Sequence, residues 1–166
     1  TAGTLMGAKV MHHFGYKDGQ LTNQTMIEAS QRIIEHITPI IQAASDDTII
    51  EFLSNDLNGI TGHIDHIIAA RIACHVFYTL KHDDARLERI RLSCLPFQDA
   101  PESNIQWLYM EAGRTPDEIT ETVDARDLRP AITAIIRTHY TQRSDGEYHI
   151  TQRGERLGVD HFIVKT

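Results

Sequence analysis

The chain has 166 residues, of which 41% are hydrophobic and 23% are charged, which predicts one globular domain with a hydrophobic core. Lysine and arginine total 16 against 23 for aspartate and glutamate, and the formal net charge of -7 argues against nucleic acid or an anionic membrane as a partner. Two cysteines do not indicate a disulfide framework or a cysteine-rich zinc module. The low cysteine content fits a reducing, cytoplasmic setting, and the sequence has no membrane-length apolar run and no secretory pattern at its start.

The first half of the sequence alternates helical and strand patterns. From Asn23, a good N-cap, apolar residues follow the 3.6-residue period of a helix that Pro39 should kink or end near Thr38. The β-branched residues of Thr48–Leu53 predict a buried strand, and an apolar run predicts a helix over Ile64–Leu80. A strand that ends in a glycine-containing loop and leads into a helix places the loop at the carboxyl edge of a sheet, where α/β folds usually bind ligands.

Shorter elements follow in the second half. Polar and apolar residues alternate over Arg89–Leu95 as in a half-buried strand, and Ile119–Val123 is β-prone. Pro130 fits the first turn of another helix, whose apolar stripe would include His139, and Gly158–Val164 is predicted as an edge strand. This alternation predicts an α/β fold with a mainly parallel sheet covered by helices.

Between these strands, residues 96–116 combine turn formers with two aromatic side chains, Trp107 and Tyr109. Sugar rings stack on aromatic faces, so this segment could form the wall of a sugar site. Simple packing of the loop explains the same residues equally well. The aromatic side chains alone therefore do not decide between these two interpretations.

The stretch with the clearest chemistry is Gly59–His66, in which His63 and His66 flank Asp65. A spacing of three brings both imidazoles to one face of the first turn of a helix, and the helical period predicts that His66 points inward. Neutral imidazole is a common zinc ligand, and Asp65 could orient an imidazole. Because ten histidines in 166 residues produce about 0.6 such pairs by chance, the pair alone is weak evidence for a metal site.

Three separated segments, Phe14–Gly19, Asp56–His66 and His139–Gln142, add to this evidence. They resemble the Gly-Tyr-x-Asp-Gly, Gly-His-Pro-Asp-His and His-x-Ser/Thr-Gln segments of the LmbE-like (PIG-L) family of zinc-dependent N-acetylglucosaminyl deacetylases. Ile64 replaces the family's proline, a mild change because proline in a first helical turn mainly preorganises the backbone. The resemblance extends from Met6 to Gln142 and implies a Rossmann-like sheet with helices on both faces.

The resemblance implies a hydrolase that removes the acetyl group from an N-acetylglucosaminyl or related N-acyl sugar. In the family, zinc activates the water that attacks the amide carbonyl carbon. His66 matches the zinc ligand, and His63 matches the histidine that stabilises the oxyanion or protonates the leaving amine, with Asp65 as its orienting partner. The implied substrate contacts are Asp18, Thr61 and His139. The expected partner is a small-molecule sugar, and the oligomeric state stays open.

Two of these residues also have simpler explanations. Asp18 and Gly19 form a common turn pair, so a substrate contact and a plain turn are equally good interpretations of Asp18. A histidine in an apolar helical stripe is more often a core residue bonded to its neighbours than a ligand, which favours a structural role for His139.

The family's other signature, Ala-His-Pro-Asp-Asp, is absent from this sequence. It supplies two zinc ligands and the general base, and catalytic zinc typically has three protein ligands. We therefore expect a single LmbE-like domain that is incomplete at its N-terminus, lacks its first strand and helix, and is inactive as it stands. The alternative is a degenerate, non-catalytic sugar-binding or scaffold protein of the same fold, with an unrelated metal-binding module as a distant third.

The start of the sequence raises a related expectation. Thr1–Gly3 resembles the end of the family's second strand, and Leu5–Ala8 resembles the entry of the next. Parallel strands need a crossover of about a dozen residues or more between them. We therefore expect connecting residues to be missing between Gly3 and Met6.

Overall fold

The computed structural model describes residues 2–100 and 111–166. The chain forms two compact units, a larger one of Gly15–Glu121 with His161–Thr166 and a smaller one of Thr1–Phe14 with Thr122–Asp160. Trp107 and Tyr109, considered above as the wall of a sugar site, lie outside the described residues. The Gly59–His66 stretch belongs to the larger unit.

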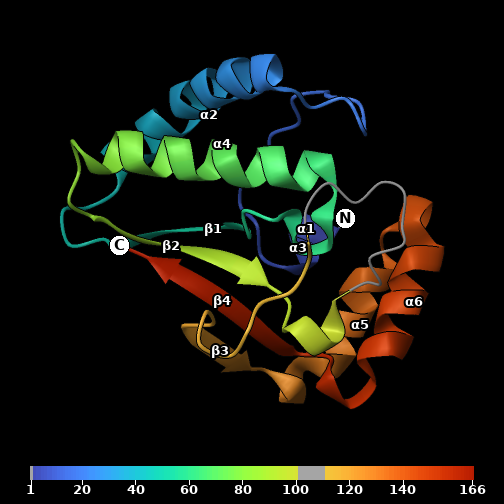
Figure 1. Ribbon diagram of the computed structural model, residues 1–166. Helices are drawn as coiled ribbons and strands as arrows, with labels where there is room; N and C mark the ends of the chain where they lie inside the picture. Colours follow the sequence, from blue (N-terminus) through green and yellow to red (C-terminus); the bar gives the residue numbers. More distant parts are fainter. Residues whose placement is uncertain (1, 101–110) are drawn as a thin grey trace. The chain divides into compact units, whose positions relative to one another are not determined.

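The sheet contains four strands in the spatial order β1-β2-β4-β3 (Figure 1). Their bounds are Ile50–Asn55 for β1, Leu87–Cys94 for β2, Glu121–Asp124 for β3 and Val159–Lys165 for β4. β1 and β2 pair in parallel, whereas β2 and β4 pair antiparallel. The fold is therefore mixed α/β, and the prediction of a mainly parallel sheet is wrong.

Chain direction explains this difference. A helical crossover connects β1 to β2 and makes that pair parallel, but the C-terminal strand β4 reaches the other edge of β2 from the opposite direction. Hydrophobic pattern identifies a strand without giving its direction. The predicted edge strand at Gly158–Val164 is found as β4, but it lies inside the sheet, between β2 and β3.

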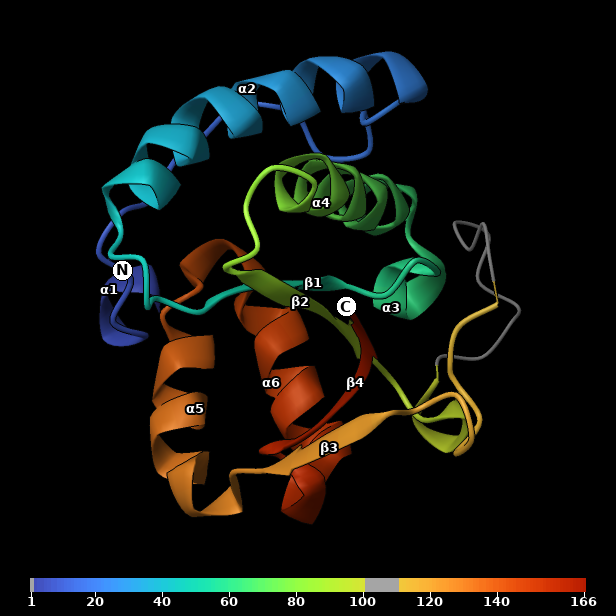
Figure 2. The same ribbon diagram turned by 90° about the vertical axis from the view of Figure 1, so that its left-hand side faces the viewer.

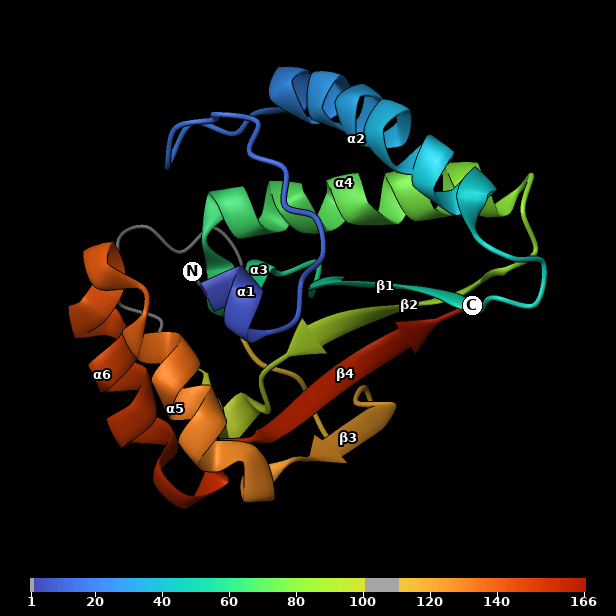
Figure 3. The same ribbon diagram turned by 180° about the vertical axis from the view of Figure 1, so that it is seen from behind.

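Two long helices, α2 (Asn23–Ala43) and α4 (Ile64–Lys81), pack in the larger unit. α4 lies against β1 and β2, and α2 packs on α4 (Figures 1 and 3). The predicted helix over Ile64–Leu80 is confirmed. The helix α2 is capped by Thr22 instead of Asn23 and does not end at Thr38. Pro39 is exposed, so the carbonyl that loses its helical N–H partner can bond to solvent.

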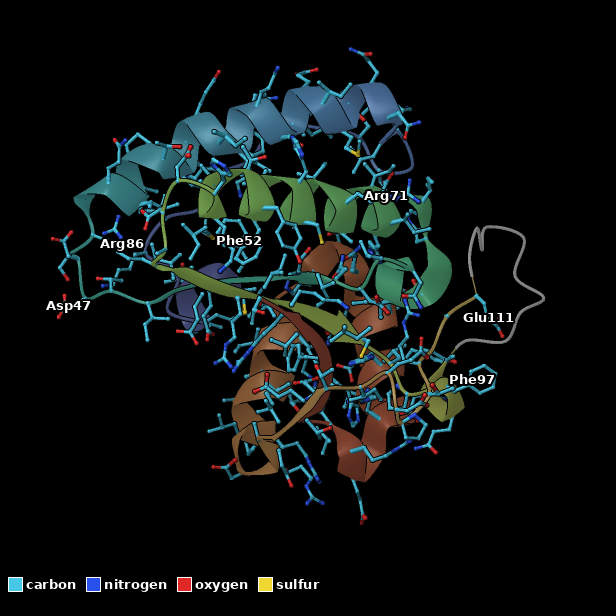
Figure 4. All side chains as sticks on the ribbon, turned by 60° about the vertical axis from the view of Figure 1, so that its left-hand side comes forward. Asp47, Phe52, Arg71, Arg86, Phe97 and Glu111 are labelled. Carbon is cyan, nitrogen blue, oxygen red and sulfur yellow. The ribbon has the colours of Figure 1, made fainter. Side chains whose placement is uncertain are left out.

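Apolar side chains fill the space between these layers. Phe52 of β1 lies between the sheet and α4 (Figure 4), with its ring centroid 5.5 Å from that of Phe77. The cluster nearest the sheet contains Ile41, Phe77, Leu87, Ile90 and Leu92. A second cluster, between α2 and α4, contains Ala29, Ile68, Ile72 and Val76. Burial of the first cluster holds α4 against the strands and burial of the second holds α2 against α4, with each fully buried Ile, Leu, Val or Phe contributing about 1.5–3 kcal/mol.

The smaller unit contains the helices α1 (Ala2–Leu5), α5 (Arg129–Arg137) and α6 (Arg143–Arg153). Pro130 lies in the first turn of α5, as predicted. The helix ends before His139, however, so His139 is not part of its stripe. Ala2–Leu5 form a helical turn instead of the expected strand end, and after this turn Met6 N–H bonds to Ala2 O and Ala8 N–H bonds to Gly3 O. The expectation of missing residues between Gly3 and Met6 stays a prediction.

Besides the short helix α3 (Gly59–Gly62), the remaining elements of the described residues are short 3-10 turns. They are η1 (Phe97–Asp99), η2 (Arg126–Leu128), η3 (Tyr140–Gln142) and η4 (Gly154–Arg156). In the part of the chain that the structure describes, no helix combines the length and the hydrophobicity that a membrane crossing requires.

Candidate functional site

The candidate site begins where β1 ends. A short helical turn, α3 (Gly59–Gly62), lies between the end of β1 and the start of α4 (Figure 2). Asn58 caps this turn, because its Oδ1 accepts from Ile60 N–H at 3.1 Å. Its Nδ2 donates to Glu111 O at 3.2 Å, which also fixes the side chain. The strand, glycine loop and helix thus occur in the predicted order, and they bring His63, Asp65 and His66 to the carboxyl end of β1.

The backbone of this turn is strained. Ile60 has φ 61° and ψ -60°, and it is the one non-glycine residue with positive φ in residues 2–100 and 111–166. A β-branched residue rarely adopts this conformation. The preceding Gly59 has φ +74°, and a Cβ there would lie 2.9 Å from Ile67 Cγ1 and 3.1 Å from His66 Cβ. Close packing against the start of α4 therefore requires glycine at this position.

The two histidines lie side by side in opposite tautomers. Their ring centroids are 5.4 Å apart. His66 Nδ1 lies 3.1 Å from Gly59 O, and a carbonyl only accepts, so Nδ1 carries a proton, and in the neutral ring Nε2 keeps its lone pair. His63 Nδ1 accepts from Asp65 N–H at 3.2 Å, so in the neutral ring Nε2 carries the proton. In the neutral rings, the pair thus has one basic nitrogen and one N–H donor.

The prediction that His66 points inward is wrong, because the residue is exposed. The buried positions in the first turns of α4 are Ile67 and Ile68. Since successive helical residues are about 100° apart, these two isoleucines turn His66 toward solvent. Its Nδ1 is nevertheless held by Gly59 O, and this bond fixes the direction of the ring.

Asp65 has a different set of contacts from the one we predicted. Its backbone N–H, not its carboxylate, provides the hydrogen bond to His63 Nδ1. The carboxylate accepts from two amides of a distant loop: Gly19 N–H bonds to Oδ2, and Leu21 N–H bonds to Oδ1 at 3.0 Å. Asp65 therefore ties this loop to the first turn of α4.

The three predicted substrate contacts differ in where they lie. Asp18 is exposed and precedes Gly19, so the structure brings it next to the Asp65 contact. Thr61 is half-buried in α3. His139 is exposed and belongs to the smaller unit, where it follows α5. Its predicted contact with a ligand stays a prediction.

Sequence reasoning missed an ion pair that holds the site loop. Asp56 is 1% exposed, and Arg114 contacts both of its oxygens, with Nε 2.6 Å from Oδ2 and Nη2 3.1 Å from Oδ1. This hydrogen bonding raises the pKa of Arg114 above its usual value. Burial, with the nearby charge of Asp56, raises the pKa of Cys94 to about 11. Asp56 lies in the segment with the family resemblance, but nothing in the sequence links it to Arg114.

The predicted zinc can be tested against the donors present. His66 Nε2 is a suitable ligand, because its partner nitrogen donates to a backbone carbonyl as in many metal-binding histidines. Catalytic zinc typically has three protein ligands. Within the described ranges, no three His, Cys, Asp or Glu side chains gather into a group that could hold a metal ion. The described residues by themselves therefore do not fit a complete catalytic zinc site.

Comparison of the chain with protein families, with curated proteins and with solved structures found no match. The chemistry of the site therefore has to be inferred from its own side chains. The groups concerned are the Nε2–H of His63, the Nε2 lone pair of His66 and the carboxylate of Asp18 on the neighbouring loop.

Proposed function

We propose that the chain is an LmbE-like domain that acts on N-acetylglucosaminyl or related N-acyl sugars and hydrolyses the amide to release acetate. The observation that carries this proposal is the pair of opposite tautomers at His63 and His66, at the carboxyl end of β1. Amide hydrolysis uses a donor for the developing oxyanion, and His63 Nε2–H has that chemistry. The same pair lies in the segment that resembles the family's Gly-His-Pro-Asp-His signature.

In this proposal His63 acts on the acyl group. Its Nε2–H donates to the carbonyl oxygen as negative charge develops there, an interaction typically contributing about 10² to 10³ in rate. His63 is also the N-cap of α4, and the positive end of the helix dipole favours negative charge nearby. Because His63 Nδ1 accepts from Asp65 N–H, the neutral ring has only its Nε2 proton, and in this proposal it holds that proton in the hydrogen bond to the oxyanion.

Zinc, when bound in this family, supplies the activated water. His66 offers one ligand for it, and the described residues do not complete the set, so no step is derived through the metal. Activity in this proposal therefore requires further zinc ligands besides His66.

A second function, binding of N-acyl sugars without hydrolysis, is favoured by one observation. No three-ligand group occurs among residues 2–100 and 111–166, and binding does not need one. Asp18 can serve either function, because its exposed carboxylate accepts hydrogen bonds from sugar hydroxyls. The two functions differ in acetate release and not in affinity for the sugar.

The test measures binding and hydrolysis on the same protein. Calorimetry with N-acetylglucosamine reports binding, and acetate release with added zinc reports hydrolysis. For an enzyme with a complete set of zinc ligands, we expect His66→Ala to lose zinc and activity, and His63→Asn to lower turnover by about 10² to 10⁴. His75→Ala, an exposed histidine on the same helix, is the control. Binding without acetate release supports the second function, and absence of binding overturns both.

A further inference from the structure

Asp65 contacts two parts of the site at once. Its backbone N–H bonds to the His63 imidazole, and its carboxylate accepts from Gly19 and Leu21. We infer that Asp65 is a positioning residue that holds the Lys17–Leu21 loop, and with it the carboxylate of Asp18, beside the histidine pair. This inference rests on the proposed function only for the identity of the ligand.

The central part of the loop depends on this contact. At its two ends, Tyr16 and Leu21 pack against the apolar cluster between α2 and α4. Residues 17–20 between them are exposed. A bond of 3.2 Å from Gln20 N–H to Lys17 O closes a turn within the loop but does not attach it to the site. The carboxylate of Asp65 provides that attachment.

Asp65 is well suited to this role. Hydrogen bonds from backbone N–H groups to an ionised carboxylate are roughly twice as strong as neutral ones. The residue lies in the first turn of α4, close to the positive end of the helix dipole. Its two oxygens bond to amides two residues apart, so the carboxylate fixes the direction of the loop as well as its distance.

The arrangement defines the kind of ligand that fits. The Asp18 carboxylate only accepts hydrogen bonds, so it selects hydroxyl or amine donors. His63 Nε2–H donates, so it selects an oxygen such as an acyl carbonyl. A ligand that satisfies both carries hydroxyl groups and an acyl group on one small framework. Asp65 would therefore determine specificity without touching the ligand, by setting the position of the hydroxyl-binding side chain.

The first test follows amide hydrogen exchange at Gly19 and Leu21. Asp65→Asn keeps the size of the side chain but replaces one accepting oxygen with an N–H₂ group. We expect exchange at these two amides to become about tenfold faster or more, with partial recovery in Asp65→Glu. Asp83→Asn, a highly exposed aspartate just beyond the other end of α4, is the matched control and should leave both rates unchanged. Equal exchange in wild type and Asp65→Asn would overturn the inference.

The second test is a double-mutant cycle read out as affinity for N-acetylglucosamine. If Asp65 acts through Asp18, Asp18→Asn weakens binding about tenfold in the wild type but less than about twofold in the Asp65→Asn background. In an active protein, Asp65→Asn should raise KM more than it lowers kcat. Equal losses in both backgrounds would count against the inference. If the wild type binds no sugar, the proposed function fails, and the exchange rates still decide whether Asp65 holds the loop.

Discussion

Asp56 and Arg114, which are 58 residues apart in the sequence, form a two-point ion pair at the end of β1. Asp56 Oδ1 also accepts from Leu57 N–H at 2.6 Å, and the backbone N–H of Asp56 bonds to Ser93 O at 2.9 Å. The residue therefore links the site loop to β2 through its backbone and to Arg114 through its side chain. This ion pair therefore fixes the position of the loop that contains Gly59 and leads to the two histidines.

Removing Arg114 should destabilise the protein strongly. In Arg114→Met the carboxylate of Asp56, only 1% exposed, is left buried without its cation, and we expect a loss of about 3 kcal/mol in the free energy of unfolding. Urea unfolding followed by circular dichroism measures it. Arg126→Met is the control, because its pair with Asp124 is about half exposed on both sides and should matter little. Similar losses in the two variants would contradict the structural importance of the buried pair.

His63 should combine a capping role with a chemical role, and two substitutions can separate them. His63→Ala removes the acceptor for Asp65 N–H and should cost about 1 kcal/mol of stability. His63→Asn supplies another N-cap acceptor and should keep nearly wild-type stability, yet it lacks the imidazole. Thermal unfolding together with acetate release would check this. An active His63→Asn variant would show that the imidazole is not needed for the reaction.

Gly59 should not tolerate a side chain. Alanine there combines positive φ with a Cβ 3.0 Å from Ile67 N, and we expect a loss of about 3 kcal/mol. Gly15 has a similar φ of +76° but open space around its Cβ position, so Gly15→Ala should cost about 1 kcal/mol. Chemical denaturation of both variants measures the difference. Equal costs would mean that backbone conformation alone, without the close packing on α4, requires glycine at position 59.

Cys94 should make stability depend on pH in the alkaline range. Its pKa is about 11 in the folded protein against an ordinary value of 9.0, so the folded state holds this proton more tightly than the unfolded state. The free energy of unfolding is then unaffected below pH 9 and falls as pH rises from 9 to 11, by about 2 kcal/mol. Urea midpoints across this range measure the fall. Cys94→Ala should show a smaller fall in the free energy of unfolding over this pH range. Identical falls in the variant and the wild type would contradict the raised pKa of Cys94.

The elements around the site were predictable from the sequence because their signals are local. The period of the apolar residues identified α4, β-branched residues identified β1, and the alternating pattern identified β2. The prediction that the β1 strand is buried is wrong, because its residues alternate between half-buried and exposed before the two half-buried residues at its end. The glycine loop between Asn55 and His63 placed the histidines at the end of a strand. Each of these signals comes from residues that are neighbours in the chain, where helix or strand periodicity determines which side chains share a face.

Tertiary structure alone decided the direction of β4, the outward position of His66, the ion pair of Asp56 and the partners of Asp65. The contacts of Asp65 join residues 44 and 46 apart, and the ion pair of Asp56 joins residues 58 apart. Such contacts depend on how separate elements pack, and no local pattern encodes a partner so far away. The histidine tautomers depend on the fold for a related reason, because each follows from the backbone group that the folded loop brings to the ring.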